Sequence, residues 1–196
     1  MADTGWKFPG AAAGNRSGGD SWANPSNITA DDTSFATVTL DNAFESSAGL
    51  AATDYDFSSI PDGATIDGIE VRIGDYSVDV TGGAPTWLNC RVIDELDADG
   101  GANSPTPGWS ASEQTALAGG ASSLWELTPS KTDVNDIDWG FFFQAWQTFG
   151  VTTVYSTDFM QMKIYYSIGP QITDVDTDET WDDGDTGLVI TGTGFV

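Results

Sequence analysis

The sequence predicts an all-β protein built as an antiparallel β-sandwich of the jelly-roll type. Short runs are rich in Val, Ile, Thr, Tyr, Phe and Trp, and 23 Gly and 8 Pro separate them. In the clearest run, 66–73, the apolar side chains of Ile69, Val71 and Ile73 alternate with charged ones. Such alternation is typical of a strand with one buried and one exposed face, and several such strands between turns favour a sandwich.

The individual elements follow from these runs. The segment 139–143 is almost continuously apolar, so its strand is expected at the centre of a sheet or covered on both faces. A helical turn is expected at 110–116, because Ser110, Ala111 and Glu113 resemble a helix start. Strands are predicted at 35–40, 66–73, 87–93, 140–147 and 160–167 and, from weaker patterns, at 43–45, 76–80, 124–127 and 151–155.

Composition divides the chain into an N-terminal arm at 1–30, a sandwich at 31–168 and a further segment at 169–196. The arm is rich in Gly, Ala, Ser and Asn, yet it carries Trp6, Phe8 and Trp22. Large rings are uncommon in solvated linkers, which favours a docked arm over a flexible one, for example an arm that lies across a neighbouring subunit. The alternative is that these rings cap the end of the same sandwich.

The charge balance narrows the choice of partners. Six Lys and Arg stand against 30 Asp and Glu, a net charge of −24. This excess disfavours binding to nucleic acid or to an anionic membrane surface. The aromatic content of 12% argues against disorder despite the charge. No apolar run is long enough to span a bilayer, and no secretion signal is evident at the N-terminus.

The residue types that the sequence lacks exclude many classes of enzyme. The chain has no His, which removes the commonest general base and the commonest zinc ligand. Acidic residues are so numerous that no particular carboxylate pair stands out for glycoside hydrolysis. Cys90 is the only cysteine, and its strand-like surroundings predict a buried structural thiol. We therefore expect a protein that is not an enzyme, with no catalytic residue and no organic cofactor.

One acidic segment resembles part of a calcium loop. Glu95, Asp97 and Asp99 alternate, and Gly100 follows them, as in the first half of such a loop. The acidic twelfth position of an EF-hand falls on Thr106, so that motif is incomplete. Two interpretations stay open, a Ca²⁺ site and a solvated acidic loop between strands.

A second candidate site concerns carbohydrate. Sugar-binding sandwiches use exposed aromatic rings for stacking, and Trp109 follows Pro107 and Gly108 in an expected loop. Trp109 is therefore the candidate ligand-binding residue. The alternative is burial in the core, which is the usual environment of such side chains.

Three blocks of sequence resemble known families. The run Ser-Ile-Pro-Asp-Gly-Ala-Thr-Ile-Asp-Gly-Ile-Glu-Val at 59–71 resembles a β-sandwich module of tailed-bacteriophage virion proteins. The segments 124–143 and 160–166 resemble later parts of the same module, in the expected order. The C-terminal segment resembles the first two strands of an IPT/TIG immunoglobulin-like domain, through Pro170, Ile172, Ile190, Gly192, Gly194 and Phe195.

The phage resemblance implies a structural virion protein at the particle surface. A capsid decoration (cement) protein is favoured, which would stabilise the head by binding the major capsid protein or other virion proteins as a homo-oligomer, a trimer by preference. One alternative is a tail or receptor-binding appendage. Another is a carbohydrate-binding β-sandwich module of a surface or adhesion protein, with a glycan as its ligand.

Overall fold

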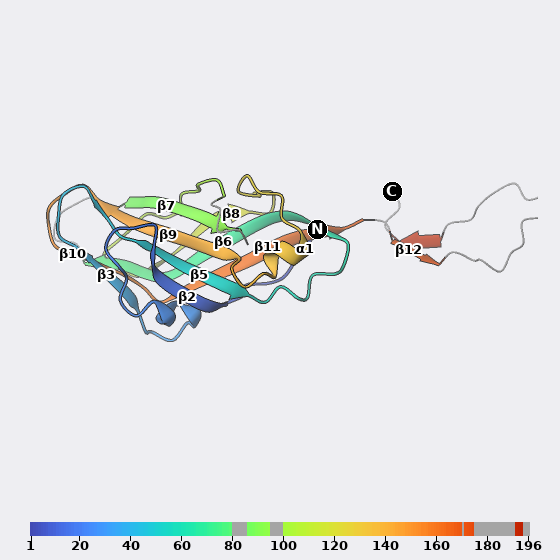
Figure 1. Ribbon diagram of the computed structural model, residues 1–196, viewed down its shortest axis with the longest axis horizontal. Coiled ribbons are helices and arrows are strands. Elements are labelled where there is room, and N and C mark those ends of the chain that lie inside the picture. The colour runs from blue at the N-terminus through green and yellow to red at the C-terminus, as the bar shows by residue number, and fades with distance from the viewer. Residues whose placement is uncertain (80–85, 95–99, 170, 175–190, 194–196) are drawn as a thin grey trace, which may run out of the picture.

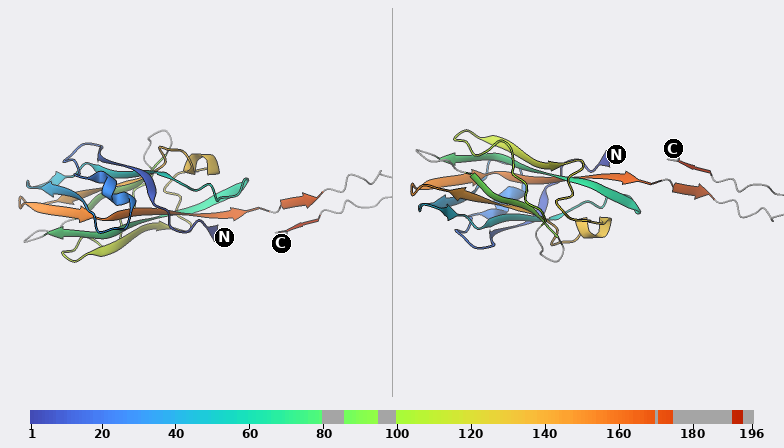
Figure 2. Two further views of the ribbon diagram at one scale, coloured as in Figure 1. Left: turned by 90° about the horizontal axis from the view of Figure 1, so that it is seen from below. Right: turned by 90° about the horizontal axis from the view of Figure 1, so that it is seen from above.

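The computed structural model describes residues 1–79, 86–94, 100–169, 171–174 and 191–193. Two antiparallel sheets pack face to face in it, as the ribbon seen from three directions shows (Figures 1 and 2). The chain is therefore an all-β protein with a β-sandwich fold, which confirms the predicted fold class.

Six strands form the first sheet and five form the second. The first sheet contains, in spatial order, β1 (Ala2–Asp3), β11 (Phe159–Ile168), β6 (Ala64–Asp79), β10 (Thr153–Thr157) and β3 (Ala36–Leu40), with β8 (Gln114–Gly120) also paired to β6. The second contains β2 (Pro9–Arg16), β5 (Gly49–Tyr55), β9 (Gly140–Gln147) and β4 (Glu45–Ser46), with β7 (Thr86–Ile93) also paired to β9. A 3₁₀ helix, η1 (Pro25–Thr29), and a short α-helix, α1 (Lys131–Val134), lie in connections.

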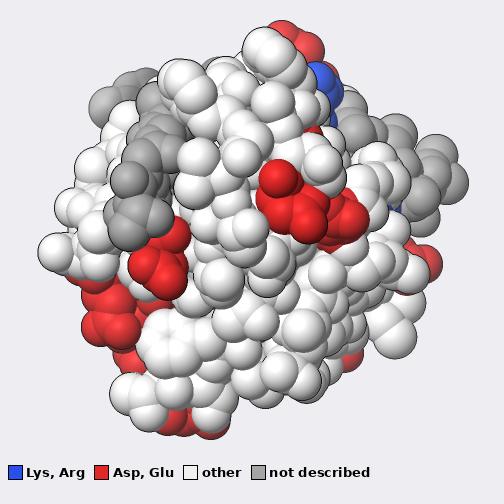
Figure 3. Space-filling view, turned by 90° about the vertical axis from the view of Figure 1, so that its left-hand side faces the viewer, with Lys and Arg blue, Asp and Glu red and all other residues white. Residues whose placement is uncertain are grey.

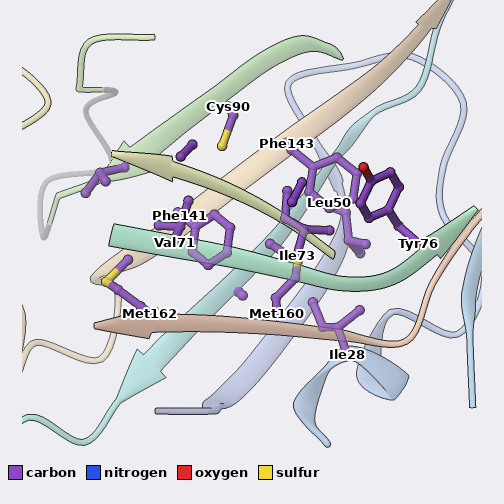
Figure 4. Close-up of a cluster of buried hydrophobic side chains, with 14 of the residues drawn as sticks. Ile28, Leu50, Val71, Ile73, Tyr76, Cys90, Phe141, Phe143, Met160 and Met162 are labelled. Atoms are coloured by element: carbon purple, nitrogen blue, oxygen red, sulfur yellow. The ribbon is translucent and has the colours of Figure 1, made fainter. Parts of the chain in front are cut away.

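The core lies between the sheets and is built by alternation along the strands. In β6 the side chains of Val71 and Ile73 point inward and meet Phe141 and Phe143 of β9 in one cluster (Figure 4). Phe142 points to the other face of its sheet, where the Arg16 guanidinium covers its ring at 5.1 Å. The predicted central strand at 140–147 is thus confirmed, and it is covered on both faces.

The strong strand predictions are confirmed, but two Ala- and Gly-rich strands escaped prediction. β2 and β5 contain few β-branched or aromatic residues, so their intrinsic preference for strands is weak. They form because their large neighbours need small partners. A Cβ on Gly49 of β5 would lie 2.8 Å from the Phe142 ring, and one on Gly14 of β2 would lie 2.9 Å from the Trp22 side chain.

The helical turn predicted at 110–116 is wrong. Residues from Gln114 onward form strand β8 on the edge of β6, with Ala116 and Ala118 buried and Leu117 exposed between them. The period of two along this segment places its small side chains against the core. Packing of these Ala residues outweighs their high helix propensity.

The strand predicted at 124–127 is also wrong, because this segment is a turn. Trp125 and Glu126 both have a positive φ, at 55° and 62°, and the Leu127 N–H bonds the Leu124 carbonyl at 2.9 Å. The turn is held by Trp125, which is buried and donates its indole N–H to the Ile69 carbonyl at 3.0 Å. The anchored side chain of Trp125 therefore determines the backbone conformation of this turn.

The first thirty residues contribute strands to both sheets. β1 pairs with β11, and β2 pairs with β5. Trp22 is buried and donates its indole N–H to the Ala48 carbonyl at 2.9 Å. Trp6 lies over the Lys163 ammonium at 4.5 Å from the ring centre. The division of the chain at residue 30 stays a prediction.

After the sandwich, the structure describes one hairpin, formed by β12 (Gln171–Asp174) and β13 (Thr191–Thr193). Pro170, Ile190, Gly194 and Phe195, which carry much of the resemblance to IPT/TIG domains, lie outside the described residues. The immunoglobulin-like segment at 169–196 thus stays a prediction. Among the helices of the described ranges, none is long and apolar enough to cross a membrane.

Candidate functional site

The structure buries Trp109, the residue predicted to stack on sugar. Its side chain is only 9% exposed and meets the ring of Tyr155 edge-on at 4.9 Å. The loop before it is drawn inward because the Tyr76 hydroxyl donates to the Pro107 carbonyl at 2.8 Å. The expectation that Trp109 is exposed is therefore wrong. It is a core residue.

The other predicted site residues, Glu95, Asp97 and Asp99, lie outside the described residues. The calcium site expected there stays a prediction. Cys90, in contrast, is buried as expected, and burial raises the pKa of its thiol.

A polar hollow lies beside α1, next to the start of β9. Its volume is about 330 Å³, and three carboxylates contribute to its wall. We call it the acidic hollow. It is lined by Asp94, Glu126, Leu127, Thr128, Pro129, Asp133 and Trp139.

Local hydrogen bonds fix Asp133, one of the carboxylates of the acidic hollow, before any ligand binds. Asp133 and Ser130 form a capping box, in which the Ser130 N–H donates to the Asp133 carboxylate at 2.7 Å and the Ser130 hydroxyl accepts from the Asp133 N–H. Glu126 is exposed and occupies a left-handed conformation next to the buried Trp125. Strained non-glycine backbone of this kind is frequent where a side chain is presented to a ligand.

Trp139 lines the acidic hollow and has an unsatisfied hydrogen-bond donor. The residue is 1% exposed, and its indole N–H has no hydrogen-bond partner among the described residues. A buried donor without a partner carries a desolvation cost of about 1–3 kcal/mol. The hollow is thus lined by several hydrogen-bond acceptors and by a tryptophan whose buried donor is unsatisfied.

A second hollow, of about 460 Å³, lies on the other flank of α1. Lys131 projects toward it and binds the exposed Asp62 carboxylate at 2.7 Å. The hydrogen bond and the positive charge of Lys131 lower the pKa of Asp62. This hollow is lined by Ser58, Asp62, Lys131, Thr132, Asn135 and Asp136.

The opposite end of the sandwich carries an exposed apolar surface instead. Phe44 is 75% exposed, Phe149 54% and Val151 38%; we call these three residues the apolar tip. They lie in the loops between β3 and β4 and between β9 and β10, which approach each other at Gly150 and Ala43. Figure 3 looks onto this end and shows uncharged surface between separate groups of Asp and Glu.

The loop that presents Phe44 is tied by one carboxylate. Glu45 accepts the backbone N–H groups of Asp41 and Asn42 at 2.6 and 2.8 Å. Burial works against ionisation of Glu45, but these bonds and the Asn42 side chain outweigh it and lower its pKa. Phe44 is held with φ at 58°, an unfavourable value for a bulky residue.

Comparisons with known proteins identify no family. No protein family and no curated protein matches the chain. Among solved structures, a chain described as "CBM4 structure and function", a carbohydrate-binding module, is similar with a TM-score of 0.40 and 13% identity, over 81% of this chain and 93% of that chain. A similarity of this size carries no functional argument.

Proposed function

We propose that the protein is a non-enzymatic binding module for carbohydrate and that the acidic hollow holds a neutral saccharide. One observation carries the proposal: three carboxylates line the hollow together with Trp139, whose buried indole N–H has no described partner. The proposal takes up the alternative of a carbohydrate-binding sandwich, which the sequence left open, and assigns the ligand to the acidic hollow instead of to Trp109.

The chemistry of the wall selects the ligand class. Carboxylates accept hydrogen bonds, and the indole N–H donates one. An anion would be repelled by Asp94, Glu126 and Asp133, while a simple cation could not accept from Trp139. A neutral hydroxyl both donates and accepts, so a saccharide satisfies both kinds of group. The hydrogen bonds that hold Ser130 and Asp133 reduce the ordering cost of binding.

Calorimetric titration with a panel of neutral hexose and pentose oligosaccharides tests the proposal. Glu126→Gln removes one charged acceptor from an exposed side chain and should weaken binding about tenfold, or about 1.4 kcal/mol. Glu113→Gln is the matched control, since Glu113 is exposed and does not line the hollow. A permethylated form of the bound oligosaccharide, which has no hydroxyl donors, should not bind.

A spectroscopic readout connects binding to Trp139. The indole N–H proton should shift in the NMR spectrum when the saccharide binds, because it gains an acceptor. Absence of binding across the panel contradicts the proposal. So does binding that leaves the Trp139 signal unmoved and the affinity of Glu126→Gln equal to that of the wild type.

A second candidate function, that of a structural virion protein, is favoured by the apolar tip together with the sequence blocks that resemble phage modules. Exposed Phe44 and Phe149 on adjacent loops suit contact with another protein, here the major capsid protein or another virion component at the particle surface.

Copy number in purified particles tests this candidate. Many copies indicate head decoration, a few indicate a tail or receptor-binding appendage, and none contradicts the candidate. Sedimentation of the isolated chain tests the expected trimer.

A further inference from the structure

Three aspartates from distant parts of the chain meet at the first sheet. Asp31 lies in the segment between η1 and β3, Asp75 lies in β6, and Asp158 joins β10 to β11. One carboxylate oxygen from each lies within 4.8 Å of the other two. Like charges at this separation repel one another unless protons or cations compensate them.

An interruption of strand pairing brings Asp75 and Asp158 together. β10 and β11 both pair with β6, through Ser156 opposite Ser77 and Phe159 opposite Gly74. Between these two stretches the ladder breaks, and Asp75 has a φ of 44°. Irregularities of this kind redirect side chains, and they are frequent next to functional sites.

Asp158 supplies the observation that points to a ligand. It is fully buried, and its Oδ2 accepts the Thr33 N–H at 2.9 Å, while its Oδ1 has no hydrogen-bond partner among the described residues. The ion pairs found within the described ranges leave these carboxylates out.

A bound cation would compensate the negative charge of the three carboxylates. A buried carboxylate without a counter-charge is unfavourable, and buried charges are normally paired or bound to metals. Ca²⁺ binds oxygen ligands at about 2.3–2.6 Å, so two of its ligands lie at most about 5 Å apart. The separations among the three carboxylates satisfy that limit.

From this geometry we propose that Asp31, Asp75 and Asp158 bind a divalent cation, and that the cation is Ca²⁺. The three carboxylates converge with one oxygen each and at uneven exposure, which suits the flexible coordination of Ca²⁺ better than the strict octahedron of Mg²⁺. Exposure falls from Asp31 through Asp75 to Asp158, so the cluster extends from the surface to the buried carboxylate. The bound ion would fasten the segment before β3 to β6. This site is independent of saccharide binding.

Thermal unfolding of the full chain, dialysed against chelator and then titrated with CaCl₂, tests the proposal. At a Ca²⁺ concentration about 100 times Kd, Tm should rise by roughly 5–10 °C. Asp158→Asn should abolish this rise. In chelator its Tm should equal or exceed that of the wild type, because a buried charge is removed and the amide can donate to Asp31 or Asp75.

Further variants distinguish this site from the calcium site expected at Glu95, Asp97 and Asp99. Asp31→Asn, at an exposed position that should tolerate the change, should weaken Ca²⁺ binding at least tenfold in calorimetry. The double variant Asp97→Asn with Asp99→Asn should keep the full response. The proposal is overturned if CaCl₂ leaves Tm unchanged, if the double variant alone loses the response, or if MgCl₂ acts equally well at equal concentration.

Discussion

The two ends of the sandwich present opposite chemistry on the same support. At one end the acidic hollow is concave and polar, and at the other the apolar tip is exposed and carries Phe44 and Phe149. Strand β9 joins them, since Trp139 precedes it and Phe149 follows it. Its eight residues span about 26 Å, so one small ligand cannot touch both ends.

Short hydrogen-bonded loops, not the sheets, determine what each end can bind. Ser130 and Asp133 order the loop at the hollow, and Glu45 orders the loop at the tip. In both places a non-glycine residue with positive φ is presented to solvent, Glu126 at the hollow and Phe44 at the tip. Both ends therefore present a residue with positive φ on a hydrogen-bonded loop, but the side chain is acidic at the hollow and aromatic at the tip.

The largest expected effect comes from the strand that supports both ends. Phe143→Ala removes a fully buried ring from the cluster between the sheets and should lower the free energy of unfolding by about 3–5 kcal/mol. Chemical denaturation measures this loss. Both ends should lose their order in the same transition, and separate transitions would show that they are supported independently.

A smaller effect should be confined to the hollow. Ser130→Ala removes the capping hydroxyl of α1 and should cost about 1 kcal/mol of stability. Saccharide affinity should fall with it, because Asp133 loses its fixed position. Thr132→Ala, in the same helix but outside the capping box, is the control and should leave affinity unchanged.

At the tip the expected change in stability has the opposite sign. Phe44→Gly places a residue that tolerates positive φ at a position with φ of 58° and should raise stability by up to about 1 kcal/mol. Phe149→Gly is the control; its φ is not positive, so it should not stabilise the protein. If both variants stabilise equally, relief of backbone strain is not the cause.

The smallest effect concerns the ion pair at the second hollow. Because Lys131 lowers the pKa of Asp62, the ionised pair favours the folded state above the ordinary Asp pKa of 3.8, and this contribution disappears as pH falls through the lowered value. NMR titration of the Asp62 carboxyl group should show the lowered pKa. In Lys131→Met the pKa should return toward its ordinary value.

The sequence predicted the strands that carry large apolar residues, because alternation is visible in β6 and a continuous apolar run is visible in β9. It did not reveal β2 and β5, where Ala and Gly are selected by the bulk of Phe142 and its neighbours across the sheet. Helix α1 had a usable signal, since Ser130 and Asp133 have the spacing of a capping box.

The candidate sites were harder to predict, because each joins separate segments. In the acidic hollow Asp94 follows β7, whereas Glu126 and Asp133 lie in the connection between β8 and β9, with Asp133 inside α1. Trp109 stands in a loop-like sequence, and only the hydrogen bond from Tyr76 reveals that the loop folds inward. Local composition does not predict contacts of this kind between residues that are distant in the sequence.

The position of Trp6 has a consequence for how copies of this chain meet in solution. Its ring lies over Lys163 and within 5.9 Å of Arg72, so two of only six cationic side chains are shielded from approaching molecules. With a net charge of −24, two copies approach through long-range repulsion that reaches about 8 Å at physiological ionic strength. Encounter rates between copies should therefore rise with added salt, and the apolar tip makes contact only after that barrier is crossed.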